Sequence, residues 1–172
     1  MAKMGVSLSQ IIRSLTPFRN PNRYPDYRIF NFKTTIWVGT KTVLYQGEVL
    51  AEGGAPVHYN VSLEFHGIEF SDVQQPGMIA TVPIAGRVLY YEAPIIGSND
   101  VRMRCTCSDF QYTFQWELKG ANALLGNPKP YTRVPGSTRP PRNPQHVLGF
   151  CKHLWNFMKY LRNSNLIKGQ LL

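Results

Sequence analysis

The chain has 172 residues, a length typical of one domain or of one domain with an extended arm. Hydrophobic side chains make up 43% of the sequence, which is enough for a buried core and excludes a chain that is disordered throughout. Charged residues make up only 17%, below the roughly 25% usual for soluble domains, so we expect part of the surface to be covered by other subunits. No apolar stretch approaches the roughly 20 residues that cross a bilayer, and we expect no membrane contact.

The net charge of +9 is unevenly distributed along the chain. Residues 1–100 carry 8 basic and 8 acidic side chains, whereas residues 101–172 carry 11 basic and 2 acidic ones, Asp109 and Glu117. This asymmetry is typical of contact with a polyanion or an acidic protein face, although a solvated basic surface would have the same composition.

The first 27 residues are predicted to form a helix and an arm. Polar residues interrupt the apolar ones in Met1–Phe18, which excludes a secretory signal and predicts a short amphipathic helix that docks on another subunit. Residues 16–28 contain three prolines and three arginines, a composition that predicts an extended linker.

Residues 28–107 are predicted to form a β domain. The segment 57–65 alternates apolar and polar residues, which indicates a strand with one solvated face. His58 and His66 fall on that solvated face, where we expect surface histidines rather than a second metal site. Together the segments predict an α+β fold with a small antiparallel sheet or sandwich; strands are expected over 28–38, 42–50, 57–65, 87–92 and 101–107, with a loop over 51–56.

The aromatic residues after Asp109 leave two structures open. Phe110, Tyr112, Phe114 and Trp116 alternate with polar residues, which favours a strand whose four rings pack in the core. A helix through Leu118, capped by Ser108 or Asp109, is the alternative. The same rings beside basic residues could also form a stacking platform for a single nucleic-acid strand.

Residues 108–172 are predicted to form a basic metal-binding module. The segment 126–146 holds six prolines, four basic residues and no acid, a composition typical of a loop anchored to a partner. Its basic residues are the expected partner contacts: Lys129, Arg133, Arg139 and Arg142. An apolar stripe predicts a final helix over Cys151–Leu161.

The three cysteines form the most specific pattern in the chain. Cys105 and Cys107 are spaced C-x-C, and Cys151 and His153 are spaced C-x-H. Residues i and i+2 of a strand point to one side, so the first pair can share an ion. The second pair can do so if Cys151 precedes the final helix and His153 lies in its first turn. Three inert buried thiols are the structural alternative.

Four ligands of this kind suit a closed tetrahedral zinc site with a structural role, and an iron–sulfur cluster is the alternative occupant. His146 could replace His153 as the fourth ligand. Structural zinc contributes on the order of 10–16 kcal/mol to the folding of small zinc domains. A closed shell argues against catalysis, and the chain carries no Walker, G-x-G-x-x-G or G-x-S-x-G motif, so we expect neither an enzyme nor a small-molecule substrate.

Two resemblances follow from these residues. The segments Cys105–Phe110 (CTCSDF) and Gly149–Leu154 (GFCKHL) resemble the two halves of a SWIM-type zinc finger, which implies binding to nucleic acid or protein. Together with NPKPY and PPRNP in the loop between them, the same segments are similar to small structural proteins of tailed bacteriophages. That second resemblance implies a virion component of the tail, baseplate or neck, present in the host cytoplasm during assembly and contacting other virion proteins through the N-terminal arm and the basic loop.

Overall fold

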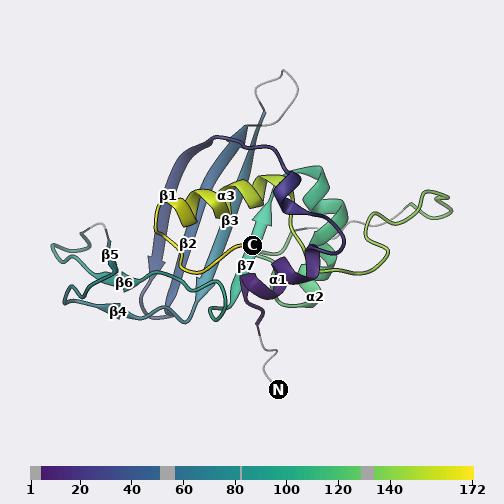
Figure 1. Ribbon diagram of the computed structural model, residues 1–172. Helices are drawn as coiled ribbons and strands as arrows, with labels where there is room; N and C mark the ends of the chain where they lie inside the picture. The colour runs from purple at the N-terminus through teal and green to yellow at the C-terminus, as the bar shows by residue number, and fades with distance from the viewer. Residues whose placement is uncertain (1–4, 51–56, 82, 129–133) are drawn as a thin grey trace.

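The computed structural model describes residues 5–50, 57–81, 83–128 and 134–172 (Figure 1). The loop predicted over 51–56 lies outside the described residues, as do Lys129 and Arg133. Helices occur together with antiparallel sheets, which confirms the predicted α+β class. None of the helices in the described part of the chain has the length and apolar character that a membrane span requires.

A four-stranded antiparallel sheet forms the centre of the molecule, in the order β1-β2-β3-β7. Its strands lie within the segments predicted from the sequence or extend at most one residue beyond them: β1 (Ile29–Trp37), β2 (Thr42–Leu50), β3 (His58–His66) and β7 (Val101–Cys105). The register places small and apolar residues in three rows across β2, β3 and β7: Val43 with Phe65 and Val101, Tyr45 with Leu63 and Met103, and Gly47 with Val61 and Cys105. The last row leads to the first cysteine of the C-x-C pair.

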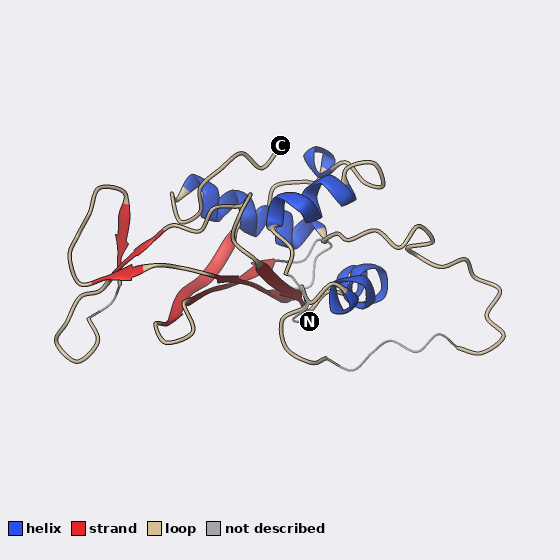
Figure 2. Ribbon diagram, turned by 90° about the horizontal axis from the view of Figure 1, so that it is seen from below, coloured by secondary structure: helices blue, strands red, loops and turns tan. Residues whose placement is uncertain are grey.

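A second, smaller sheet extends from one end of the molecule (Figures 1 and 2). It consists of β4 (Phe70–Ser71), β5 (Met78–Ala80) and β6 (Tyr90–Glu92) in the order β4-β6-β5. The strand predicted over 87–92 is therefore confirmed only over its last three residues. Tyr91 of β6 joins the two sheets, because its hydroxyl lies 3.1 Å from that of Tyr45 in a buried tyrosine pair.

The N-terminal helix α1 (Leu8–Leu15) begins at a capping box between Ser7 and Gln10. Its apolar face is fully covered by this chain, because Leu8, Ile11, Ile12 and Leu15 are all buried in the common core. The apolar face of α1 therefore packs within this chain, and the docking of the N-terminal region on another subunit stays a prediction. The arm that follows contains a short 3₁₀ helix, η1 (Pro21–Arg23).

The aromatic segment after Asp109 is helical, so the predicted strand is wrong and the helical alternative is confirmed. It forms a π-helical turn, η2 (Phe110–Phe114), that continues into α2 (Gln115–Gly120). Phe110, Phe114 and Leu118 follow one another at intervals of four residues and are fully buried. Tyr112 and Trp116 lie on the opposite side and are 43% and 66% exposed, so only two of the four rings pack in the core.

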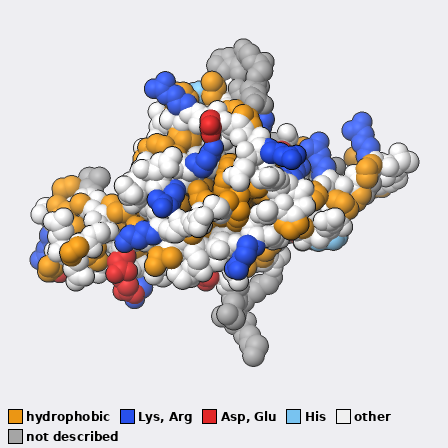
Figure 3. Space-filling view, in the orientation of Figure 1, with side chains coloured by type: hydrophobic (Ala, Val, Ile, Leu, Met, Phe, Trp, Pro, Cys, Tyr) orange, Lys and Arg blue, Asp and Glu red, His pale blue; other side chains and the backbone are white. Residues whose placement is uncertain are grey.

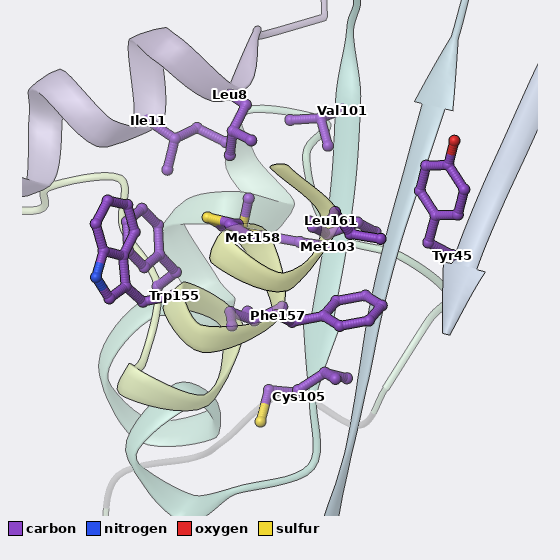
Figure 4. Packing of buried hydrophobic residues seen from close by; sticks show 14 of the residues in the cluster. Leu8, Ile11, Tyr45, Val101, Met103, Cys105, Trp155, Phe157, Met158 and Leu161 are labelled. Atoms are coloured by element: carbon purple, nitrogen blue, oxygen red, sulfur yellow. The ribbon is translucent and has the colours of Figure 1, made fainter. Parts of the chain in front are cut away.

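The last helix, α3 (Lys152–Asn163), lies across one face of the large sheet and contacts all four of its strands (Figure 1). In Figure 4, Met158 and Leu161 of α3 lie beside Met103 of β7, and Leu8 of α1 packs above them. One buried cluster thus draws side chains from all three of the predicted regions, 1–27, 28–107 and 108–172.

Candidate metal centre

The structure brings together the four residues that the sequence singled out as metal ligands. Cys105 ends β7, Cys107 follows two residues later, and Cys151 is the N-cap of α3 with extended backbone. His153 is the second residue of α3, which confirms the predicted arrangement at the start of the final helix. All four residues are buried, and their donor atoms all lie within 4.8 Å of one another. Three thiols and one imidazole this close together could hold a metal ion.

Local contacts organise the thiols. The backbone N–H of Cys107 donates to Cys105 Sγ at 3.5 Å, and the N–H of Phe110 donates to Cys107 Sγ at 3.3 Å. Cys105 Sγ lies 3.9 Å from His153 Nδ1. The Nδ1 atom of the imidazole therefore faces the cysteines.

The pKa values of the three thiols are shifted in different directions. Hydrogen bonds from Cys105 and Cys151, with those from His153 and the Phe110 N–H, hold the pKa of Cys107 well below its ordinary value. The hydrogen bond with Cys107 raises the pKa of Cys105, and burial raises the pKa of Cys151. Three adjacent thiolates would repel one another in this buried space, so the chain alone favours one thiolate. A dication would supply the charge that stabilises all three.

Aromatic rings enclose the imidazole. The ring of Tyr59 lies 4.7 Å from that of His153, and the ring of Tyr27 lies 5.5 Å away, both measured between centroids. The Nε2 atom of His153 is buried and has no hydrogen-bond partner among the described residues. Packing by the tyrosines, rather than a hydrogen bond to Nε2, therefore sets the orientation of the imidazole.

Two buried asparagines, neither of which the sequence indicated as part of this site, hold the chain around it. The Asn143 amide donates to the carbonyls of Thr113 and Val147 at 3.1 and 2.9 Å, which fixes the return of the long loop beside η2. In α3, Asn156 accepts from the Tyr27 N–H and donates to the Pro25 carbonyl, both at 2.8 Å. The role of Asn156 could have been predicted from the sequence. An amide within the apolar stripe of a helix is buried and therefore needs hydrogen-bond partners from other segments.

Gly149 lets the chain pass close to the core just before Cys151. A Cβ atom at this position would lie 2.6 Å from a ring carbon of Phe114 and 2.8 Å from Leu15. Phe150 then stacks on Trp155 with ring centroids 5.7 Å apart, which anchors the first turn of α3. The approach of the chain to Cys151 is thus fixed by close packing on both sides.

The other histidines lie away from the cluster. His146 is exposed and pairs with Glu117 at 2.7 Å, so the alternative in which it replaces His153 is wrong. His58 pairs with Glu48 at 2.9 Å and His66 with Glu64 at 2.8 Å, both on the polar face of the sheet. Within the described residues, the Cys105 cluster is the one group with metal-binding geometry.

The two described members of the predicted partner contacts lie together in a surface groove. Arg139 and Arg142 both line it, and the Arg142 guanidinium lies over the ring of Tyr112 at 5.4 Å. No family model, curated protein or solved structure matches the chain, so its function has to be argued from these sites.

Proposed function

We propose that Cys105, Cys107, Cys151 and His153 bind one zinc ion. Zn–S bonds of about 2.3 Å and Zn–N bonds of about 2.0–2.1 Å in a tetrahedron place neighbouring donors about 3.6–3.8 Å apart. The 3.9 Å between Cys105 Sγ and His153 Nδ1 is close to this spacing, and no donor pair exceeds 4.8 Å. An iron–sulfur cluster must fit several iron and sulfide atoms between its ligands, and donors this close favour a single ion.

The role that we propose for this ion is structural. Four protein donors complete a tetrahedral shell, whereas catalytic zinc keeps one position open for water or substrate. The ion would join the end of β7, the turn before η2 and the start of α3. The test is elemental analysis with an absorption spectrum of the purified protein: we expect one zinc per chain and no visible band, whereas iron with a charge-transfer band would contradict the assignment.

We further infer that the chain is a structural component of a tailed-phage virion. Two projections support this, since the small sheet and the long loop extend from opposite ends of the body (Figures 1 and 2). Each carries exposed apolar side chains: Val73 is 63% exposed and Ile84 is 52% exposed near the small sheet, and Val134 is 68% exposed in the loop. These side chains give both projections apolar surface that a neighbouring subunit can bury. The resemblance of the cysteine segments to phage structural proteins agrees with this reading.

The test is incorporation into particles. The chain should co-purify with virions through a density gradient at a fixed copy number. Ile84→Asp should abolish incorporation while leaving the melting temperature unchanged, and Asn22→Asp, which adds a charge at an exposed position of η1, should be incorporated normally. A chain found only in the soluble fraction would contradict the proposal.

A second candidate is a nucleic-acid-binding module of SWIM type. It is favoured by the basic surface, because Lys and Arg side chains spread over the face that carries α3, where acidic groups are few (Figure 3). Binding of this kind should weaken steeply with salt, with a slope set by the number of phosphates contacted. A tightly DNA-binding monomer that is absent from particles would favour this candidate over the virion component.

A further inference from the structure

A groove beside α2 has features that the metal centre does not explain. It has a volume of about 470 Å³ and lies between α2 with its preceding π-helical turn and the returning part of the long loop. We call it the aromatic groove; it is lined chiefly by Tyr112, Trp116, Arg139, Pro140, Pro141 and Arg142. Its volume falls within the range of about 300–1,000 Å³ typical of sites for small ligands or short chain segments.

Two aromatic rings form one wall of this groove. Tyr112 and Trp116 are four residues apart on successive turns and are exposed to the same side. The indole of Trp116 has no ring partner among the described residues, and its N–H has no hydrogen-bond acceptor there. An exposed indole beside a tyrosine presents flat apolar surface and one unused donor, a combination typical of interfaces.

The charge of the aromatic groove is positive. Arg139 and Arg142 both line it. Glu117 also lines it, but that carboxylate is paired with His146 at 2.7 Å. The other acid of residues 101–172, Asp109, is paired with Arg19 at 2.8 Å. Two arginines against one carboxylate give the lining of the groove a net positive charge, which favours an anionic partner.

We infer that the aromatic groove binds an extended, proline-containing peptide segment that carries an acidic residue and belongs to a different protein. Such segments adopt the polyproline II conformation, which leaves their carbonyls unpaired and docks in aromatic-lined grooves. The Trp116 N–H can donate to one of these carbonyls, and Arg142 can bind the carboxylate. The loop of a second copy, itself proline-rich, is disfavoured because it carries four basic residues and no acid.

Single-stranded nucleic acid fits this groove less well. Strand-binding proteins combine stacked rings with a basic track that follows many phosphates. The groove offers two arginines and a wall of two prolines, which match one carboxylate and an apolar backbone better. This inference rests on the proposed function in one respect: a protein that contacts other virion proteins would meet such a peptide segment in one of them. Binding itself can be tested with a synthetic peptide.

The probe is a peptide of three Pro-Pro-Glu repeats, titrated calorimetrically into the full chain. We expect saturable binding that Trp116→Ala weakens about tenfold or more, the effect typical of a central aromatic contact. Trp37→Ala is the matched control, because Trp37 is also exposed but lies at the end of β1. Arg142→Gln should weaken binding of this peptide, and a peptide of Pro-Pro-Lys repeats should not bind.

Three outcomes with peptides, and a fourth with a nucleic acid, would overturn the inference. The first is that the Pro-Pro-Glu peptide shows no saturable binding. The second is that Trp116→Ala binds it as tightly as the native chain does, and the third is that a Gly-Ser-Glu repeat binds as tightly as the Pro-Pro-Glu peptide. Tighter, Trp116-dependent binding of a ten-nucleotide oligothymidylate would also overturn it and assign the groove to nucleic acid. Because the assay uses neither particles nor metal content, failure of the virion proposal would leave the peptide result standing, and the reverse also holds.

Discussion

Removing the proposed zinc ion by chelation is the perturbation that tests the candidate metal centre most directly. Cys107 and Cys151 are separated by the 43 residues from 108 to 150, so an ion bound by both closes a long loop. The chain-entropy model for a covalent cross-link assigns about 4 kcal/mol to a loop of that length. We therefore expect the free energy of unfolding to fall by at least about 4 kcal/mol on chelation, which is the loop-closure part of the zinc contribution and already a large part of the roughly 5–15 kcal/mol typical of a whole domain.

Cys151→Ser should cost more than chelation. The serine hydroxyl would be fully buried where the thiol is, and an unsatisfied buried hydroxyl adds about 1–3 kcal/mol. The total of about 5–7 kcal/mol corresponds to a fall in melting temperature of about 10–28 °C for a chain of this size. In excess chelator the free energies of unfolding of the variant and the native chain should differ only by the contribution of the buried hydroxyl.

The assay is thermal unfolding with and without chelator, paired with metal analysis and hydrogen exchange. We expect the native chain to lose stability with chelator, whereas Cys151→Ser should be nearly insensitive to it. Exchange should rise in α3 and α1 before it rises in β2, because both helices pack around Gly149 and its neighbours. The reasoning is refuted if the native chain, stripped of metal, melts within about 2 °C of the loaded protein, given the roughly 2–4 °C expected per kcal/mol.

Three further changes test separate parts of the structure. His153→Asn should lower the affinity for metal at least about tenfold, measured by titration against a competing chelator, whereas His146→Asn should bind metal as the native chain does. Equal effects of the two substitutions would disprove the ligand assignment. Gly149→Ala should lower stability by about 1–3 kcal/mol in chemical denaturation, because its Cβ would lie 2.6 Å from a ring carbon of η2, while Gly97→Ala has open space and should be neutral. Burial raises the pKa of both members of the tyrosine pair, so the folded state keeps their protons. The contribution of each tyrosine to stability should be constant below about pH 10 and fall above it by up to about 1.4 kcal/mol per pH unit. Tyr91→Phe should reduce that alkaline slope in denaturant titrations at pH 8 to 11, and an unchanged slope would count against the pair.

The sequence was sufficient to predict the cluster of candidate metal ligands, because the geometry within each pair is local. A strand places residues i and i+2 on one side, which fixes Cys105 beside Cys107. The N-cap and first turn of a helix place Cys151 near His153. The sequence could not predict the packing that brings the two pairs together, because that packing depends on α3 lying across all four strands of the large sheet.

The helix after Asp109 shows where periodicity is ambiguous. Alternating aromatic residues predict a strand, yet Phe110, Phe114 and Leu118 also fit a helical repeat of four. A local contact favours the helix, because Thr113 Oγ1 donates to Asp109 Oδ1 at 3.1 Å, four residues away. Tertiary packing also fits the helix, since the buried ring of Phe114 lies so close to Gly149 that a Cβ there would be 2.6 Å from it.

These contacts change what the metal would hold in place. The sequence suggests a C-terminal module that could loosen by itself, but Leu15 of α1 packs against Gly149, and Ser14 Oγ accepts from the Leu148 N–H at 3.0 Å. The far end of α3 is held independently, because the Tyr45 hydroxyl donates to the Leu166 carbonyl at 2.9 Å just beyond that helix. Loss of the ion should therefore free the start of α3 while its other end stays on the sheet. Because α1 contacts the segment leading into that start, we expect loss of the ion to loosen the N-terminal helix as well.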